Sequence, residues 1–393
     1  MKDHLGVRVG LTILPIVLSL AITAVIIVLV GADPIAVFNA VMQGAFRNTN
    51  SFSGVINFWM PLALCSMGLI VTFTAGLWNI GVEGQMAMGA IAASWAARTF
   101  VMPSEVLIPI EIVIAMLAGS AWALLVGILK TKLGVHEIFG GVALNSLANV
   151  YAIYLIAGPW QPPEGGSAQS TAPFPDYSLL PPVSTEFPFS LLMLVIVAVA
   201  ILVVVLALRG TRWGLQLKAT GKNARSALLL GVPTTQSAVT ALMVCGALAG
   251  IAGAYRVLFT YESLRPFASG GIGFLGLLVV LLAANRALLV PLVGFAVAAV
   301  FTGSTRLRVA LQLDTSLAGV LQGLLVLCVL LVNGLRTRLS ENRPQAAPLA
   351  QPAAYETRTP TTTLDMLAAH ARDDKADDSV TASTPESPKE GQA

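Results

Sequence analysis

The chain has 393 residues, of which 56% are hydrophobic and 11% are charged, and its mean hydropathy is +0.79. Soluble domains carry about 25% charged residues, so this composition excludes a soluble globular protein and indicates an integral membrane protein. The net charge of +3 is too small to suggest a nucleic-acid partner. The three cysteines lie far apart in apolar sequence and match neither a disulfide framework nor a metal site.

Ten apolar runs predict the membrane-spanning elements, because a helix needs about 20 apolar residues to cross a bilayer. In chain order they are Gly10–Gly31, Asn57–Gly76, Gly84–Met102, Leu107–Leu129, Ile138–Ala157, Pro188–Leu208, Gln236–Tyr255, Ile272–Asn285, Leu288–Gly303 and Ser316–Val332. The eighth and ninth runs are short and rich in glycine, so one long broken helix or a re-entrant pair is an alternative there. The sequence predicts an all-α, polytopic membrane bundle of about ten transmembrane helices.

The distribution of lysine and arginine predicts the orientation, because these residues concentrate in cytoplasmic loops. Placing both termini inside puts the most basic loop, 209–233, in the cytoplasm and leaves the loop Gly158–Glu186, which has no lysine or arginine, outside. The end of the chain is rich in Pro, Thr, Ala and Asp, a composition that cannot bury enough apolar surface to fold. We therefore expect a plasma-membrane protein with a transmembrane domain at 1–335 and a disordered cytoplasmic tail at 336–393.

The stretch Gly76–Gly89 stands out because it places polar residues between long apolar runs. It contains one carboxylate, two carboxamides and four glycines. Acids inside membrane-length apolar sequence are costly and usually functional, and glycines allow a helix to break beside a cavity. The sequence predicts that a substrate route through the bilayer passes near this stretch.

Four residues have the chemistry to bind a neutral ligand rich in hydroxyl groups. Carboxamides donate and accept hydrogen bonds, and a carboxylate accepts from paired hydroxyls. The candidate pathway residues are Asn79, Glu83, Gln85 and Asn145. An alternative role for Glu83 is to brace a helix break. This role is favoured because counting residues places Glu83 near the cytoplasmic edge. An alternative role for Asn145 is a hydrogen bond between helices.

Small residues predict where helices approach closely. Gly119, Ala123 and Gly127 recur every four residues in the fourth span, as do Gly246 and Gly250 in the seventh. A second glycine-rich stretch, at residues 270–276, is a candidate counterpart of Gly76–Gly89, because paired broken helices mark the route in many transporters. Close helix packing is the alternative explanation for that stretch.

The loop 209–233 has the features of a docking site. Apolar and charged residues alternate in it and predict a short amphipathic helix from about Asn223 to Leu230, with Gly231 and Pro233 as its stop signal. Such a helix would either lie on anionic lipid or dock a cytoplasmic partner. The candidate contact residues are Trp213, Leu215, Lys218, Gly221, Asn223, Ala224, Ala227 and Gly231.

The chain lacks a phosphate-binding loop of its own. The best match to G-x-x-x-x-G-K-[ST] ends at Gly221, Lys222 and Asn223, but Gln216 replaces the first glycine and Asn223 replaces the final Ser or Thr. If transport is driven by ATP, another chain must hydrolyse it. We expect this chain to bind no cofactor and no metal itself.

Three segments carry a resemblance to a known family. Residues 79–85 resemble the NIGVEGQ signature of ABC importer permeases of the nucleoside and simple-sugar class, which are similar to branched-chain amino acid permeases. Residues 217–227 are similar to the LRAVGxNxxAA coupling segment of that family, and residues 135–145 to its VNEVIxTxMLN stretch. The resemblance covers roughly 33–333, and the IDLSVG pattern of ribose-type relatives is absent, which favours nucleosides.

The resemblance implies a permease subunit of an ATP-binding cassette importer for a nucleoside or a related simple sugar. It implies that this chain has no enzymatic activity and that a cytoplasmic ATP-binding subunit uses the ATP and is coupled through the eight contact residues above. It also implies two further partners, which are a second identical or homologous permease chain and an extracytoplasmic substrate-binding lipoprotein or protein.

The alternative is an ion-coupled secondary transporter or channel for a small polar solute, which predicts a chain of intramembrane acids or histidines; Glu83 and Glu137 alone fit that description. A membrane-embedded enzyme fits less well, because His4, His136 and His370 are scattered and form no catalytic set.

Overall fold

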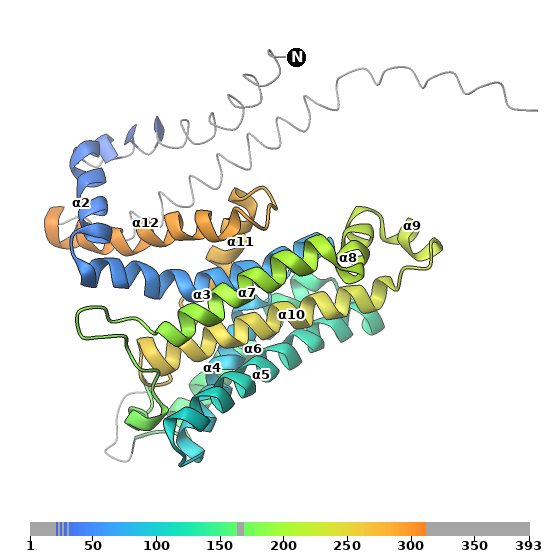
Figure 1. Cartoon of the computed structure of the whole chain (residues 1–393), viewed down its shortest axis with the longest axis horizontal. Helices are drawn as coiled ribbons and strands as arrows, with labels where there is room; N and C mark the ends of the chain where they lie inside the picture. Colours follow the sequence, from blue (N-terminus) through green and yellow to red (C-terminus); the bar gives the residue numbers. More distant parts are fainter. Residues whose placement is uncertain (1–20, 23, 26, 30, 163–168, 312–393) are drawn as a thin grey trace, which may run out of the picture. The chain divides into compact units, whose positions relative to one another are not determined.

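The computed structural model describes residues 21–22, 24–25, 27–29, 31–162 and 169–311, with side chains as far as residue 305. Its elements are α2 (Pro34–Phe46), α3 (Thr49–Thr74), α4 (Val82–Thr99), α5 (Ser104–Leu133), α6 (Glu137–Ala157), η1 (Asp176–Ser178), α7 (Leu191–Gly210), α8 (Arg212–Lys222), α9 (Ala224–Leu229), α10 (Thr234–Tyr255), η2 (Arg256–Thr260), α11 (Ile272–Leu282) and α12 (Val290–Leu311). Helices α3, α7 and α10 run side by side, and α5 packs on α10 (Figure 1).

The predicted all-α membrane bundle is confirmed for the described residues. Five helices are long and apolar enough to cross a membrane, namely α3, α5, α6, α7 and α10 extended by η2, and α2, α11 and α12 are shorter apolar helices. Most of the predicted span Gly10–Gly31, all of Ser316–Val332 and the predicted tail lie outside the described residues. Helix α2 was not predicted, although Asp33 caps it by accepting a hydrogen bond from Ile35 N at 3.0 Å.

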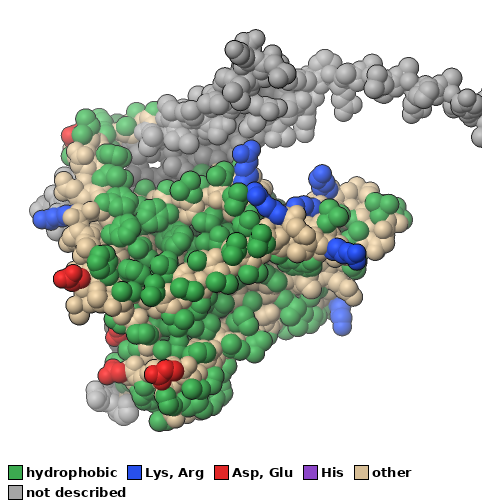
Figure 2. Space-filling model, in the orientation of Figure 1, with side chains coloured by type: hydrophobic (Ala, Val, Ile, Leu, Met, Phe, Trp, Pro, Cys, Tyr) green, Lys and Arg blue, Asp and Glu red, His purple; other side chains and the backbone are tan. Residues whose placement is uncertain are grey.

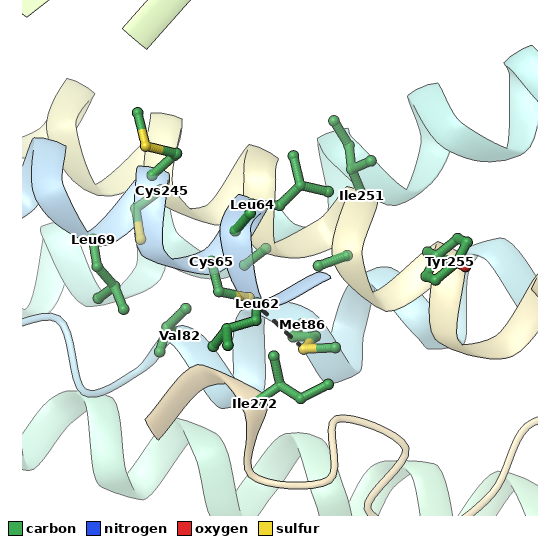
Figure 3. Packing of buried hydrophobic residues seen from close by; sticks show 14 of the residues in the cluster. Leu62, Leu64, Cys65, Leu69, Val82, Met86, Cys245, Ile251, Tyr255 and Ile272 are labelled. Atoms are coloured by element: carbon green, nitrogen blue, oxygen red, sulfur yellow. Dashed lines mark hydrogen bonds between the residues drawn. The ribbon is translucent and has the colours of Figure 1, made fainter. Parts of the chain in front are cut away.

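Helix α3 lies at the centre of the bundle. Every residue from Met60 to Thr72 is buried, and a helix that is buried on all sides needs neighbours all round it. Those neighbours include α7, α10, α11 and α12. Figure 3 shows Leu62 and Cys65 of α3 beside Ile272 of α11, with Cys245 of α10 close by.

The glycine pattern of the fourth and seventh spans produces direct backbone contact between α5 and α10. A Cβ added at Gly119 would lie 2.2 Å from the Gly246 carbonyl oxygen, and one added at Gly250 would lie 2.1 Å from the Ala115 carbonyl oxygen. Any side chain at these positions would separate the two backbones, so the predicted close packing is confirmed here. At Gly127, by contrast, an added Cβ would meet the Val239 side chain at an ordinary 3.4 Å.

The eighth and ninth predicted spans are two separate helices, α11 and α12, rather than one long helix. Residues Ala284 and Asn285 take left-handed φ values of 49° and 57° between them. Because this conformation costs a residue with a side chain about 1–2 kcal/mol, a helix cannot continue through it. Both helices pack on α3 and therefore belong to the same bundle.

We predict that Gly119→Ala lowers the melting temperature of the detergent-purified protein, because overpacking a tight interface costs about 1–3 kcal/mol. The melting temperature is measured from a thermal unfolding curve that is monitored by size-exclusion chromatography. Gly127→Ala is the matched control on the same helix and should melt like the wild type. Equal melting temperatures for the two variants would contradict the close contact between α5 and α10.

Candidate functional site

The site begins where α3 ends at a glycine turn. Gly76 takes a φ of +76°, and the amide of Leu77 donates to Thr72 O at 2.9 Å. This arrangement terminates a helix and favours glycine, because the left-handed conformation has no steric cost for it. The following residues, 77–81, are not helical, and α4 starts only at Val82.

The non-helical segment returns into the bundle and buries a pair of carboxamides. Asn79 is fully buried, and its Nδ2 donates to Gln85 Oε1 and to Cys245 Sγ, each at 3.1 Å. Gln85 Nε2 donates back to Asn79 Oδ1 at 3.1 Å. The two predicted pathway amides therefore bond to each other in this conformation, which satisfies polar groups that burial would otherwise make costly.

Asn145 of α6 forms hydrogen bonds with the same segment and with the start of α4. Its Oδ1 accepts from the Gly84 amide at 2.7 Å, and its Nδ2 donates to Ile80 O at 2.9 Å. One side chain thus pairs two backbone groups that the broken helix leaves without helical partners. Asn145 therefore forms a hydrogen bond between helices α6 and α4, and it lies beside the other candidate residues.

Glu83 links α4 to α11. Its side chain is 2% exposed, and its Oε1 accepts hydrogen bonds from the amides of Gly273 at 3.0 Å and Phe274 at 3.4 Å. These amides belong to the first turn of α11, where the helix dipole favours a negative charge. The side chain of Ser269 lies near the carboxylate. The other carboxylate oxygen, Glu83 Oε2, has no hydrogen-bond partner among the described residues.

Helix α4 begins beside the middle of α3 rather than beyond its end. Met86, one turn further along α4, contacts Cys65 Sγ at 3.9 Å (Figure 3). Cys65 lies nine residues before the last residue of α3, Thr74, which corresponds to about 13 Å of helix. The start of α4 therefore lies inside the bundle, because the chain turns back after Gly76.

The two glycine-rich stretches meet at this carboxylate. An added Cβ at Gly273 would lie 2.8 Å from Val82 Cγ1 and 3.1 Å from Glu83 N, so the starts of α4 and α11 are in contact. Both helices begin inside the bundle rather than at its surface. Two helix N-termini that converge within a membrane protein are typical of transporter substrate routes.

Arg256 is a buried residue of this region that none of the sequence patterns above singles out. It is 9% exposed, its Nε donates to Ala268 O at 3.2 Å, and its guanidinium lies 4.4 Å from the ring centroid of Tyr261, whose hydroxyl also accepts from it. These contacts fix the connection between α10 and α11 and so position the first turn of α11. The sequence signal that could have identified Arg256 is its position directly after an apolar run, with Tyr261 five residues later.

The basic loop contains two helices where one was predicted. The predicted helix corresponds to α9, which Asn223 caps by accepting from Ser226 N at 3.0 Å, whereas α8 was missed. Trp213 donates to Thr240 Oγ1 at 3.1 Å and so attaches α8 to α10.

The exposed side of α8 and α9 is apolar and basic. Leu215 is 69% exposed and Leu229 is 84% exposed, whereas Ala227 is buried inside the chain. Of the remaining contact candidates, Lys218 and Ala224 are exposed, and Gly231 ends the region with a φ of +79°. Figure 2 shows most of the lysine and arginine side chains of this face near α8 and α9, with the acidic residues at the other end of the bundle.

Comparisons with known proteins agree with this architecture. A family model described as branched-chain amino acid transport system / permease component matches residues 51–330. The chain is 27% identical to a glucose ABC transporter permease of Haloferax volcanii over 81% of this chain and 86% of the relative, and 29% identical to a guanosine ABC transporter permease of Bacillus subtilis over 75% and 84%. It is 26% identical to a nucleoside ABC transporter permease of Lactococcus lactis over 71% and 79%. No solved structure matches the chain.

We predict that Asn145→Ala destabilises the protein strongly, because it leaves the Gly84 amide and the Ile80 carbonyl unpaired at a cost of about 1–3 kcal/mol each. Thermal unfolding in detergent measures the effect. Ser146→Ala is the control, since the Ser146 hydroxyl is exposed and bonds to Val142 O of its own helix. If both variants unfold at the same temperature, Asn145 does not hold the start of α4.

Proposed function

The chain belongs to the branched-chain amino acid transport system permease family, and from this premise we propose that it imports a nucleoside, or a related simple sugar, as the membrane subunit of an ABC transporter. Membership itself makes it an ABC permease, a multi-pass membrane protein whose transport depends on an ATPase and a substrate-binding partner. The match over residues 51–330 carries the proposal. The names of the glucose, guanosine and nucleoside permeases support its substrate class.

The surface of α8 and α9 is the proposed contact with the ATP-binding subunit. Exposed leucines beside lysine and arginine offer an apolar contact with charge steering, which suits a protein partner. The gathering of basic residues at this end of the bundle supports a cytoplasmic location, because the positive-inside rule places lysine and arginine there. ATP is hydrolysed on the partner subunit, and this chain converts the resulting movement into opening and closing of the bundle. A second permease chain completes the membrane part.

The site around Glu83 is the proposed substrate route. Its Oε1 is committed to α11, whereas its Oε2 has no hydrogen-bond partner among the described residues. When α4 and α11 separate, Oε2 is free to accept from a sugar hydroxyl, and Asn79 and Gln85 can exchange their mutual bonds for bonds to the ligand. Each group has both a protein partner for the closed conformation and the chemistry to bind a neutral polyol.

Uptake by cells that express the chain together with the ATPase, the substrate-binding protein and any second permease encoded by neighbouring genes tests the function. We expect uptake of radiolabelled guanosine, or of glucose, that vanadate inhibits because it blocks ATP hydrolysis by the partner. A protonophore should have little immediate effect. Uptake that a protonophore abolishes and vanadate spares would favour the ion-coupled alternative instead.

We predict that Glu83→Gln keeps the fold but lowers uptake about tenfold, because a hydrogen bond to a charged group contributes about 1.5–3 kcal/mol. A glutamine can still accept from the first turn of α11 but lacks the second anionic oxygen. Initial uptake rates at equal amounts of membrane protein measure the effect. Glu105→Gln, at an exposed position in the first turn of α5, is the control. Unchanged uptake of both guanosine and glucose would remove Glu83 from the route.

We predict that Ala224→Glu abolishes co-purification of the ATPase. A glutamate in the first turn of α9 is favourable for the helix itself, so the change acts on the partner rather than on the fold. A pull-down through a tag on this chain measures the effect. Val183→Glu, in the exposed loop at the opposite end of the bundle, is the control and should retain the ATPase. Wild-type recovery of the ATPase with Ala224→Glu would place the docking surface elsewhere.

A further inference from the structure

Helix α8 contacts the turn that leads into the substrate site, and this contact is between backbones. A Cβ added at Gly221, in the last turn of α8, would lie 2.2 Å from Thr74 O and 3.0 Å from Gly76 N. One added at Gly76 would lie 3.1 Å from Gly221 Cα. No side chain separates the two segments, so a displacement of one backbone cannot be absorbed by a change of rotamer.

The turn on the other side of this contact is short. Asn79 follows Gly76 by three residues and is buried against Cys245 and Gln85. Residues 77–81 are non-helical, and Asn145 holds them by donating to Ile80 O. A movement of Gly76 therefore reaches the buried carboxamides through a few residues of non-helical chain.

The opposite end of α8 is also held closely. A Cβ at Gly214 would lie 2.3 Å from Ala207 O of α7, and Trp213 bonds to Thr240 of α10. Beyond Asn223, which caps both helices, α9 exposes its leucines to the solvent. Force applied to α9 thus acts on a helix that is fixed near its start and touches the Gly76 turn at its end.

We propose that Gly221 and Gly76 are positioning residues that pass the movement of α8 directly to the segment carrying Asn79. The inference rests on the proposed function, and it adds the route by which ATP hydrolysis reaches the site. Pulling α9 moves the end of α8, the Gly76 turn follows, and Asn79 leaves Cys245. The buried thiol of Cys245 is uncovered in the same step.

The wild-type complex, purified through a tag on this chain with its ATPase, allows a test without any substitution. A small methanethiosulfonate reagent is applied in the nucleotide-free and vanadate-trapped states, and modification of Cys245 is quantified by mass spectrometry. We expect the labelling rate to differ at least about fivefold between the two states, the lower bound of a typical coupling between sites. Equal rates in a complex that hydrolyses ATP would overturn the proposal.

A pair of variants tests whether the glycine contact causes the difference in Cys245 labelling between the two states. The Cβ that Gly221→Ala adds is directed at Thr74 and Gly76, so this variant should lose the difference in Cys245 labelling, together with about tenfold of the guanosine or glucose moved per ATP. Gly210→Ala, where an added Cβ meets nothing within 4 Å, should behave like the wild type. A Gly221→Ala complex with wild-type coupling would also overturn the proposal. If no ATPase co-purifies with the wild type, the proposed function fails, whereas an active complex with unchanged labelling contradicts this inference alone.

Discussion

The carboxylate of Glu83 at the first turn of α11 is the interaction on which the site depends. It connects two helices that are 190 residues apart in sequence and that both begin inside the bundle. A helix N-terminus buried away from water has amide groups without partners, and an anion from a neighbouring helix satisfies them and complements the dipole. Without an acceptor at this position, the first-turn amides of α11 that Glu83 binds would be left without this partner inside the bundle.

Much of the architecture follows from the sequence because membrane burial is a strong constraint. Apolar length predicts α3, α5, α6, α7 and α10, and glycine spacing predicts that α5 and α10 pack closely, since both effects depend on local sequence. The position of the start of α4 inside the bundle could not be predicted in the same way. It depends on the chain turning back after Gly76 and on the contact of Glu83 with α11, which is 190 residues away in sequence.

The candidate site residues show the same division. Their chemistry was apparent from a polar stretch in apolar sequence, and the structure brings Asn79, Glu83, Gln85 and Asn145 together around the start of α4. Their partners were not apparent, because Cys245 and the amides of α11 come from the second half of the chain. Helix α8 was missed because glycine and polar residues in its sequence hide a helix that Thr211 caps through Gly214 N at 3.0 Å.

The backbone contact of α5 with α10 also limits how the bundle can open. Sliding one helix along the other would drive a side chain such as Ala115 or Ala123 into a space where the opposing main chain leaves no room. These two helices are therefore expected to travel as a single rigid block during transport. The conformational cycle must then be carried by the elements outside that block.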